Sequence, residues 1–206
     1  MPTATTPDLD EAPVTTRPLR TLVVIGSTRK DRFGTIPAAW ISERATARTD
    51  LDVEVVDLAA LELPVILPGD NPEAVAPEAV RALGTQIGAA DAVIIVTPVY
   101  NRGYPASLKN AIDWFYGEWH ATPVGFVSYG GRTGGIEAVA QLRTVFTELD
   151  TMTIRDALTI PNFWTVFDDA GRPHQAEPMN AAATSFLDQL AWWAHALRSA
   201  KESADQ

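Results

Sequence analysis

The feature that most constrains the fold of this chain is a pair of short, uninterrupted apolar runs. They span residues 22–25 (Leu-Val-Val-Ile) and 92–96 (Ala-Val-Ile-Ile-Val). A strand with one face in water alternates apolar and polar side chains, so a run without alternation predicts a strand that is covered on both faces. Strands of this kind are typical of parallel sheets that have helices on either side.

The rest of the chain repeats the same pattern of strand and helix. Further strands are expected at residues 51–58, 123–129 and 151–160, and apolar residues at helical spacing follow each strand. This alternation predicts one three-layer α/β domain. Its expected bounds are residues 19–200, with a proline-rich tail at 1–18, predicted to be disordered, and a short C-terminal tail at 201–206.

Composition excludes several classes of function. With 16 Lys and Arg against 26 Asp and Glu, the formal net charge is 16 − 26 = −10, which argues against a nucleic-acid partner. There is no cysteine for thiol chemistry, and the three histidines lack the spacing of a metal site, so no metal is expected. Without a secretory signal or an apolar run of membrane-spanning length, we expect a cytoplasmic protein with no membrane partner.

Three loops of unusual composition follow the first, third and fourth strands. They span residues 26–35, 97–105 and 128–135. Ligands of open parallel sheets bind beyond the carboxyl ends of the strands, so these loops are expected to meet there and form the site.

The first loop is suited to a phosphate group. Ser27 and Thr35 offer hydroxyls, Arg29 and Arg32 offer positive charge, and Gly34 lets backbone N–H groups approach the ligand. The loop matches neither the Walker pattern nor the dinucleotide Gly-x-Gly-x-x-Gly pattern. A capped turn with solvated arginines is the alternative. Lys30, between the two arginines, is expected to face solvent.

The other two loops are suited to a flat, partly polar ring. Tyr100 and Tyr104 supply planar surfaces, and Asn101 supplies an amide donor and acceptor. The four glycines of residues 128–135 would let backbone amides lie against a ring edge. Surface aromatics and a mobile loop are the alternatives. A mononucleotide, which carries a phosphate beside a planar heterocycle, accounts for the composition of all three loops better than three independent coincidences.

The three loops together resemble those of the NAD(P)H-dependent FMN reductase family. The longest matching stretch is residues 97–114, with the pattern Thr-Pro-x-Tyr-Asn-x-Gly-Tyr-Pro followed by x-x-Leu-Lys-Asn-Ala-Ile-Asp-Trp, and the likeness runs from about residue 19 to about 161. The resemblance implies a flavodoxin-like α/β/α sandwich with a five-stranded parallel sheet in the order 2-1-3-4-5. It also implies FMN as cofactor and NADPH or NADH as co-substrate.

The resemblance assigns roles to particular residues. It implies phosphate contacts from Ser27, Arg29, Gly34, Thr35 and Ile36, with Arg32 and Phe33 nearby. It places the isoalloxazine ring along Pro98, Val99, Tyr100 and Asn101, with Ser128, Tyr129, Gly130 and Gly131 on its other side. Arg102 and Tyr104 are candidates for contact with the second substrate. No side chain is expected to act as a general acid or base, because the flavin carries the hydride.

Two residues depart from the family pattern. Val99 stands where the family commonly has Glu, and Arg102 stands where it often has His or Ser. Both changes make the site more positive, which favours an anionic reduced flavin or an acidic acceptor.

The function that follows is an oxidoreductase passing hydride from a nicotinamide to FMN. The electrons then pass to free flavin, a quinone or another small electrophile. A flavodoxin-type electron-transfer module without a nicotinamide site is the alternative, and a flavin-free structural relative is a third possibility. The resemblance also implies a homodimer or homotetramer, in which we expect Trp119 or Trp164 to lose exposure and help to wall the site.

Overall fold

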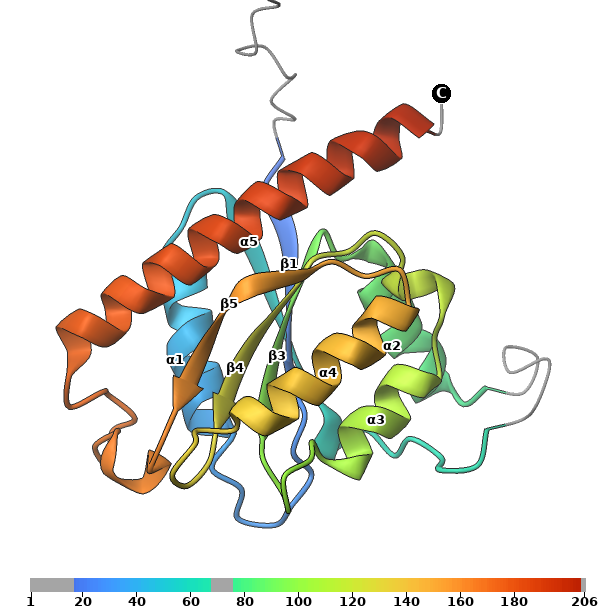
Figure 1. Cartoon of the computed structure of the whole chain (residues 1–206). Helices are drawn as coiled ribbons and strands as arrows, with labels where there is room; N and C mark the ends of the chain where they lie inside the picture. Colours follow the sequence, from blue (N-terminus) through green and yellow to red (C-terminus); the bar gives the residue numbers. More distant parts are fainter. Residues whose placement is uncertain (1–16, 68–75, 205–206) are drawn as a thin grey trace, which may run out of the picture.

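Five parallel strands form a single sheet in the computed structural model, which describes residues 17–67 and 76–204 (Figure 1). The sheet order is β2-β1-β3-β4-β5, and every neighbouring pair is parallel. The strands are β1 (Leu19–Ile25), β2 (Leu51–Asp57), β3 (Ala92–Pro98), β4 (Val124–Tyr129) and β5 (Thr153–Ile160). The flavodoxin-like sheet predicted from the sequence is thereby confirmed.

Helices cover both faces of this sheet in separate layers. They are α1 (Thr35–Thr46), α2 (Glu78–Ala89), α3 (Ala106–Asp113), α4 (Ile136–Glu148) and α5 (Ala176–Ala204), with short 3-10 turns η1 (Leu58–Ala60), η3 (Gly117–Trp119) and η4 (Phe163–Thr165). Helices α1 and α5 pack on one face, and α2, α3 and α4 pack on the other. Within the described ranges, no helix has the length and apolar character that crossing a membrane requires.

Burial follows the position of each strand in the sheet. Every residue of the inner strands β3 and β4 is buried, as is every residue of the inner strand β1 except Arg20, whereas the edge strands β2 and β5 contain exposed positions. The inner strands therefore need apolar side chains on both faces, which is why the runs at 22–25 and 92–96 are uninterrupted.

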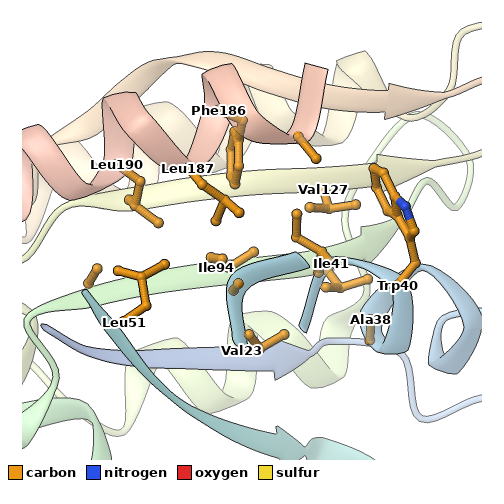
Figure 2. Close-up of a cluster of buried hydrophobic side chains, with 14 of the residues drawn as sticks. Val23, Ala38, Trp40, Ile41, Leu51, Ile94, Val127, Phe186, Leu187 and Leu190 are labelled. Carbon is orange, nitrogen blue, oxygen red and sulfur yellow. The ribbon is translucent and has the colours of Figure 1, made fainter. Parts of the chain in front are cut away.

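The core between the sheet and the α1–α5 layer is built from interlocking aliphatic and aromatic side chains. Figure 2 shows Ile41 of α1 and Phe186 of α5 lying over Val23 and Ile94 of the sheet, all at most 1% exposed. Burying a side chain of this size contributes about 1.5 to 3 kcal/mol to stability. This packing holds the strand ends, and hence the loops that follow them, in fixed positions.

Two details differ from the sequence-based expectation. Helix α5 continues to Ala204, beyond residue 200, where the domain was expected to end. Trp119 is 2% exposed within one chain, so the prediction that it loses exposure at a subunit interface is wrong. Its indole instead packs against Phe146 with ring centroids 5.2 Å apart, in a core cluster.

The expected N-terminal tail lies outside the described residues apart from positions 17 and 18.

Close packing of α5 on β4 predicts a large effect for one small substitution. A Cβ added at Gly125 would lie 2.8 Å from Cε2 of Phe186 and closer still to its Cζ. We expect Gly125→Ala to lower the free energy of unfolding by about 1 to 3 kcal/mol, the usual cost of overpacking. Denaturant unfolding monitored by circular dichroism measures it.

Gly117→Ala is the matched control, because an added Cβ there meets nothing within 4 Å. Its unfolding free energy should stay within about 0.5 kcal/mol of the parent. Equal midpoints for the two variants would contradict the packing of Phe186 on β4.

Candidate functional site

A cavity of about 470 Å³ opens at the carboxyl end of the sheet, where the three predicted loops meet. The loops after β1, β3 and β4 form most of its wall, and η4 after β5 closes one side. The lining residues are Arg29, Lys30, Asp31, Arg32, Phe33, Pro98, Val99, Tyr100, Tyr129, Gly130, Gly131 and Phe163. The volume lies within the ordinary range for small-molecule sites.

Hydrogen bonds between strand ends tie the loops to one another. The backbone N–H of Val99 donates to the Tyr129 carbonyl at 3.2 Å, and that of Gly130 donates to the Ile160 carbonyl at 3.2 Å. The hydroxyls of Ser27 and Tyr100 lie 2.8 Å apart and join the first loop to the second. The hydrogen bonding between neighbouring strands thus continues into the loops that form the site.

The second loop ends in a tight turn at residues 100–103. Tyr100 and Gly103 exchange two backbone hydrogen bonds of 2.8 and 2.9 Å, and Asn101 and Arg102 between them have φ of 49° and 71°. Positive φ at both central residues is the signature of a type I′ turn. The Gln141 amide donates to the Arg102 carbonyl at 2.8 Å and fixes the turn against α4.

The third loop is shaped by close backbone contacts. A Cβ at Gly130 would lie 2.6 Å from Cγ1 of Val99, and one at Gly134, where φ is 64°, would lie 2.9 Å from the Pro161 nitrogen. The buried Ser128 hydroxyl donates to the Gly134 carbonyl at 2.8 Å. Glycine is therefore required here for packing and backbone conformation.

Three aromatic rings lie along one side of the cavity. The Phe33 ring centroid is 4.5 Å from that of Phe163 and 5.5 Å from that of Tyr129, and the Tyr129 and Phe163 centroids are 5.7 Å apart. Phe163 is held by its backbone N–H, which donates to the Gly130 carbonyl at 3.3 Å. This wall is rigid because each ring fixes the other two.

Basic side chains give one end of the cavity a positive charge. Arg29 and Lys30 are exposed, and Arg32 is partly buried. Arg32 forms an ion pair with Asp57 at the end of β2, so the pair fixes the guanidinium beside the cavity. Lys30 is exposed as expected, but it also lines the cavity and so is not remote from the site.

Nine of the predicted site residues line the cavity, and the structure places the others around it. Ser27 is fully buried behind the lining, and Gly34 begins α1 against the Tyr129 hydroxyl. Thr35 and Ile36 face a separate hollow on the outer side of α1. Ser128 is buried and holds the third loop through its hydrogen bond to the Gly134 carbonyl. The turn-tip residue Asn101 is exposed and lies outside the lining.

The two candidates for substrate contact lie outside the cavity lining. Arg102 is 83% exposed and pairs with Glu137 at 3.4 Å. Tyr104 packs against the core cluster on the α2–α4 face. Either residue can meet only a molecule that extends beyond the cavity mouth.

Sequence reasoning missed Phe163 as a lining residue. It is the residue through which the fourth strand end, that of β5, contributes to the site. The available signal was the segment Pro161-Asn162-Phe163-Trp164 directly after an expected strand. In an open parallel sheet, every carboxyl end on the same side can contribute to the site.

Two buried polar atoms beside the cavity have no hydrogen-bond partner among the described residues. They are the Tyr129 hydroxyl and Nε of Arg32. Both can donate, and an unpaired buried donor costs about 1 to 3 kcal/mol. The residues present thus fit a ligand with an acidic, hydrogen-bond-accepting end. No group of three or more His, Cys, Asp or Glu in the described ranges is placed to hold a metal ion.

The family model for NADPH-dependent FMN reductases matches residues 19–165. This chain belongs to the NADPH-dependent FMN reductase family. The matched range covers the sheet, the three loops and η4 up to Thr165, so it contains the whole cavity lining.

Individual members of this family agree with the assignment. The chain is 39% identical over 146 residues to an NAD(P)H-dependent FMN reductase of Schizosaccharomyces pombe, covering 68% of this chain and 72% of the relative. It is 32% identical over 190 residues to a 2-hydroxy-1,4-benzoquinone reductase of a Burkholderia species, covering 85% of this chain and 96% of the relative.

A solved structure of similar fold comes from Paracoccus denitrificans. It is FerB, a flavoenzyme NAD(P)H:(acceptor) oxidoreductase, with a TM-score of 0.67 and 28% identity. The match covers 84% of this chain and 97% of FerB. The family assignment predicted from the three loops is confirmed.

Proposed function

We propose that this protein is an FMN-dependent NAD(P)H oxidoreductase. NADPH or NADH reduces the bound flavin, and a small-molecule acceptor (free flavin, a quinone or another electrophile) then takes the electrons. The observation that carries the proposal is a single cavity with a basic end at the first loop and an end at the second and third loops that has no charged side chain. Family membership supplies the cofactor class.

The residues of the cavity divide into two groups by the part of FMN that they suit. Arg29, Arg32 and the start of α1 at Gly34 suit the phosphate, because cationic side chains and free backbone N–H groups bind anions. Pro98, Val99, Tyr100, Gly130 and Gly131 line the uncharged part of the cavity, which suits the ring. When bound, FMN supplies the hydride-accepting and electron-donating chemistry.

The lining is poor in histidine and carboxylate side chains, which are the most common general acids and bases. Among the described lining residues there is no histidine, and Asp31 is the one carboxylate. The work left to the chain is therefore to bind and orient the flavin, to exclude water on the side of the aromatic wall, and to set the local charge.

Charge at the mouth of the cavity favours an acidic acceptor or an anionic reduced flavin. Val99 places an apolar group near the ring, and its Cγ1 packs against Gly130. Arg102 adds a largely exposed positive charge at the turn tip, with one weak partner in Glu137. Opposite charges attract most strongly where water is partly excluded.

We also propose that the protein is cytoplasmic and that it forms a homodimer or homotetramer, the latter as the family resemblance implies. Trp164 and Trp192 are 62% and 64% exposed, which is unusual for large aromatics. Trp164 follows Phe163 of the aromatic wall, so a neighbouring subunit that covers Trp164 would also shield the site. Excluding water in this way benefits hydride transfer.

Reduction of the flavin by a nicotinamide is the direct test of the activity. We expect the purified protein, or apoprotein reconstituted with FMN, to show an oxidised flavin spectrum that bleaches when NADPH or NADH is added without oxygen. A quinone added next should restore the spectrum. A bound flavin that neither nicotinamide reduces would favour an electron-transfer module, and a chain that binds no flavin would contradict both functions.

Removal of Arg29 tests the position of the phosphate. We expect Arg29→Ala to weaken FMN binding by about 1.5 to 3 kcal/mol, the range for hydrogen bonds to charged groups. Titration of apoprotein with FMN measures the change. Arg155→Ala is the charge-matched control, because Arg155 is exposed on β5 and does not line the cavity. Equal affinities for Arg29→Ala and the parent would overturn the assignment.

Assembly is tested by light scattering at micromolar concentration. We expect a mass of at least twice the 22.3 kDa of one chain. A monomer that binds FMN and oxidises NADPH at full rate would contradict the shielding of the site by a second subunit.

A further inference from the structure

The hydroxyl of Tyr129 is the most unusual polar atom beside the cavity. Tyr129 is 4% exposed, and its hydroxyl has no hydrogen-bond partner among the described residues. If only the ring of Tyr129 were needed for packing, phenylalanine would fill the same space without the cost of an unpaired buried donor. The hydroxyl therefore indicates a hydrogen-bond acceptor that a bound ligand would supply.

The phenol is aimed at the first loop. A Cβ added at Gly34 would lie 2.7 Å from the Tyr129 hydroxyl oxygen, so this oxygen sits directly against the N-cap residue of α1. The ring cannot easily turn elsewhere, because Phe33 and Phe163 flank it with centroids 5.5 and 5.7 Å away.

The neighbours of this hydroxyl are the groups expected around a phosphate. Ser27, the Gly34 backbone and the Arg32 guanidinium each lower the pKa of the Tyr129 phenol, and the neighbouring Tyr100 phenol raises it, yet the hydroxyl has no hydrogen bond of normal geometry among the described residues. Gly34 caps α1 without a side-chain hydrogen bond, which leaves the Thr35 N–H of the first turn without a partner among the described residues; the Ile36 N–H donates to the Phe33 carbonyl at 3.0 Å, and Pro37 has no N–H. A helix N-terminus, a cation and an unpaired hydroxyl thus converge on one point.

We infer that Tyr129 donates a hydrogen bond to the phosphate of FMN. This inference rests on the proposed function, and it moves Tyr129 from the ring, where the family resemblance places it, to the phosphate end of the cofactor. Burial raises the pKa of the phenol well above its usual value, so the hydroxyl keeps its proton at neutral pH and remains a donor.

The inference is tested with two flavins that differ only in the phosphate. Apoprotein of the parent and of Tyr129→Phe is titrated with FMN and with riboflavin, and binding is followed by quenching of flavin fluorescence. We expect Tyr129→Phe to raise the Kd for FMN by about tenfold to a hundredfold, the effect of losing one hydrogen bond to a charged group. The Kd for riboflavin should stay unchanged.

Two further measurements separate this role from a structural one. Thermal unfolding of Tyr129→Phe apoprotein should occur at the same temperature as the parent or higher, because the variant removes an unpaired buried hydroxyl. Tyr116→Phe is the matched control: Tyr116 is exposed and lies outside the cavity lining, so the affinity for both flavins should be that of the parent.

The outcomes distinguish this inference from the proposed function. Equal loss of affinity for FMN and riboflavin in Tyr129→Phe would overturn the inference, because the hydroxyl would then act on the ring or on the loop as a whole. Unchanged affinity for both flavins would overturn it too, while leaving the proposed function intact. A parent protein that binds neither flavin would overturn the proposed function itself.

Discussion

The parallel pairing of β1 with β3 is the constraint on which the rest of the structure depends. Residues 21–25 pair in register with residues 92–96, although about seventy positions separate them along the chain. After β1 the chain turns to α1 on one face, and after β3 it turns to α3 on the other. The two connections diverge and leave a crevice at the carboxyl ends of the strands. The 2.8 Å contact between the Ser27 and Tyr100 hydroxyls follows directly from this pairing.

Local backbone strain is concentrated at this same edge of the sheet. Of the six non-glycine residues with positive φ in the described part of the chain, four lie in its loops: Asp31, Asn101, Arg102 and Asn162. Such conformations cost about 1 to 3 kcal/mol each when unfavourable, so they persist only where the surrounding structure holds them. Here the buried inner strands and the bonds between strand ends provide that support. The loops can thus present backbone and side chains to a ligand with little reorganisation.

The electrostatics of the site run against those of the chain as a whole. The chain carries a formal net charge of −10, yet Arg29, Lys30 and Arg32 face one end of the cavity with Asp31 as the one acid among the lining residues. Asp57 orients Arg32 through an ion pair without belonging to the lining. The buried phenol of Tyr129 adds a neutral donor to this end. The opposite end, lined by Val99, Tyr100 and Gly130, has no charged side chain, which suits a flat ring.

The sequence by itself determined the fold class, the family and the three loops of the site. Uninterrupted apolar runs define buried parallel strands, and the position of a loop after a strand places it at the carboxyl end, because both depend on local order along the chain. Only the tertiary structure decided which loop residues face the cavity. Ser27, Ser128 and Tyr104 turned out to be packed behind or beside it, and Phe163 joined it from β5. The direction of the Tyr129 phenol and the burial of Trp119 were decided in the same way, since side-chain direction and burial depend on neighbours distant in sequence.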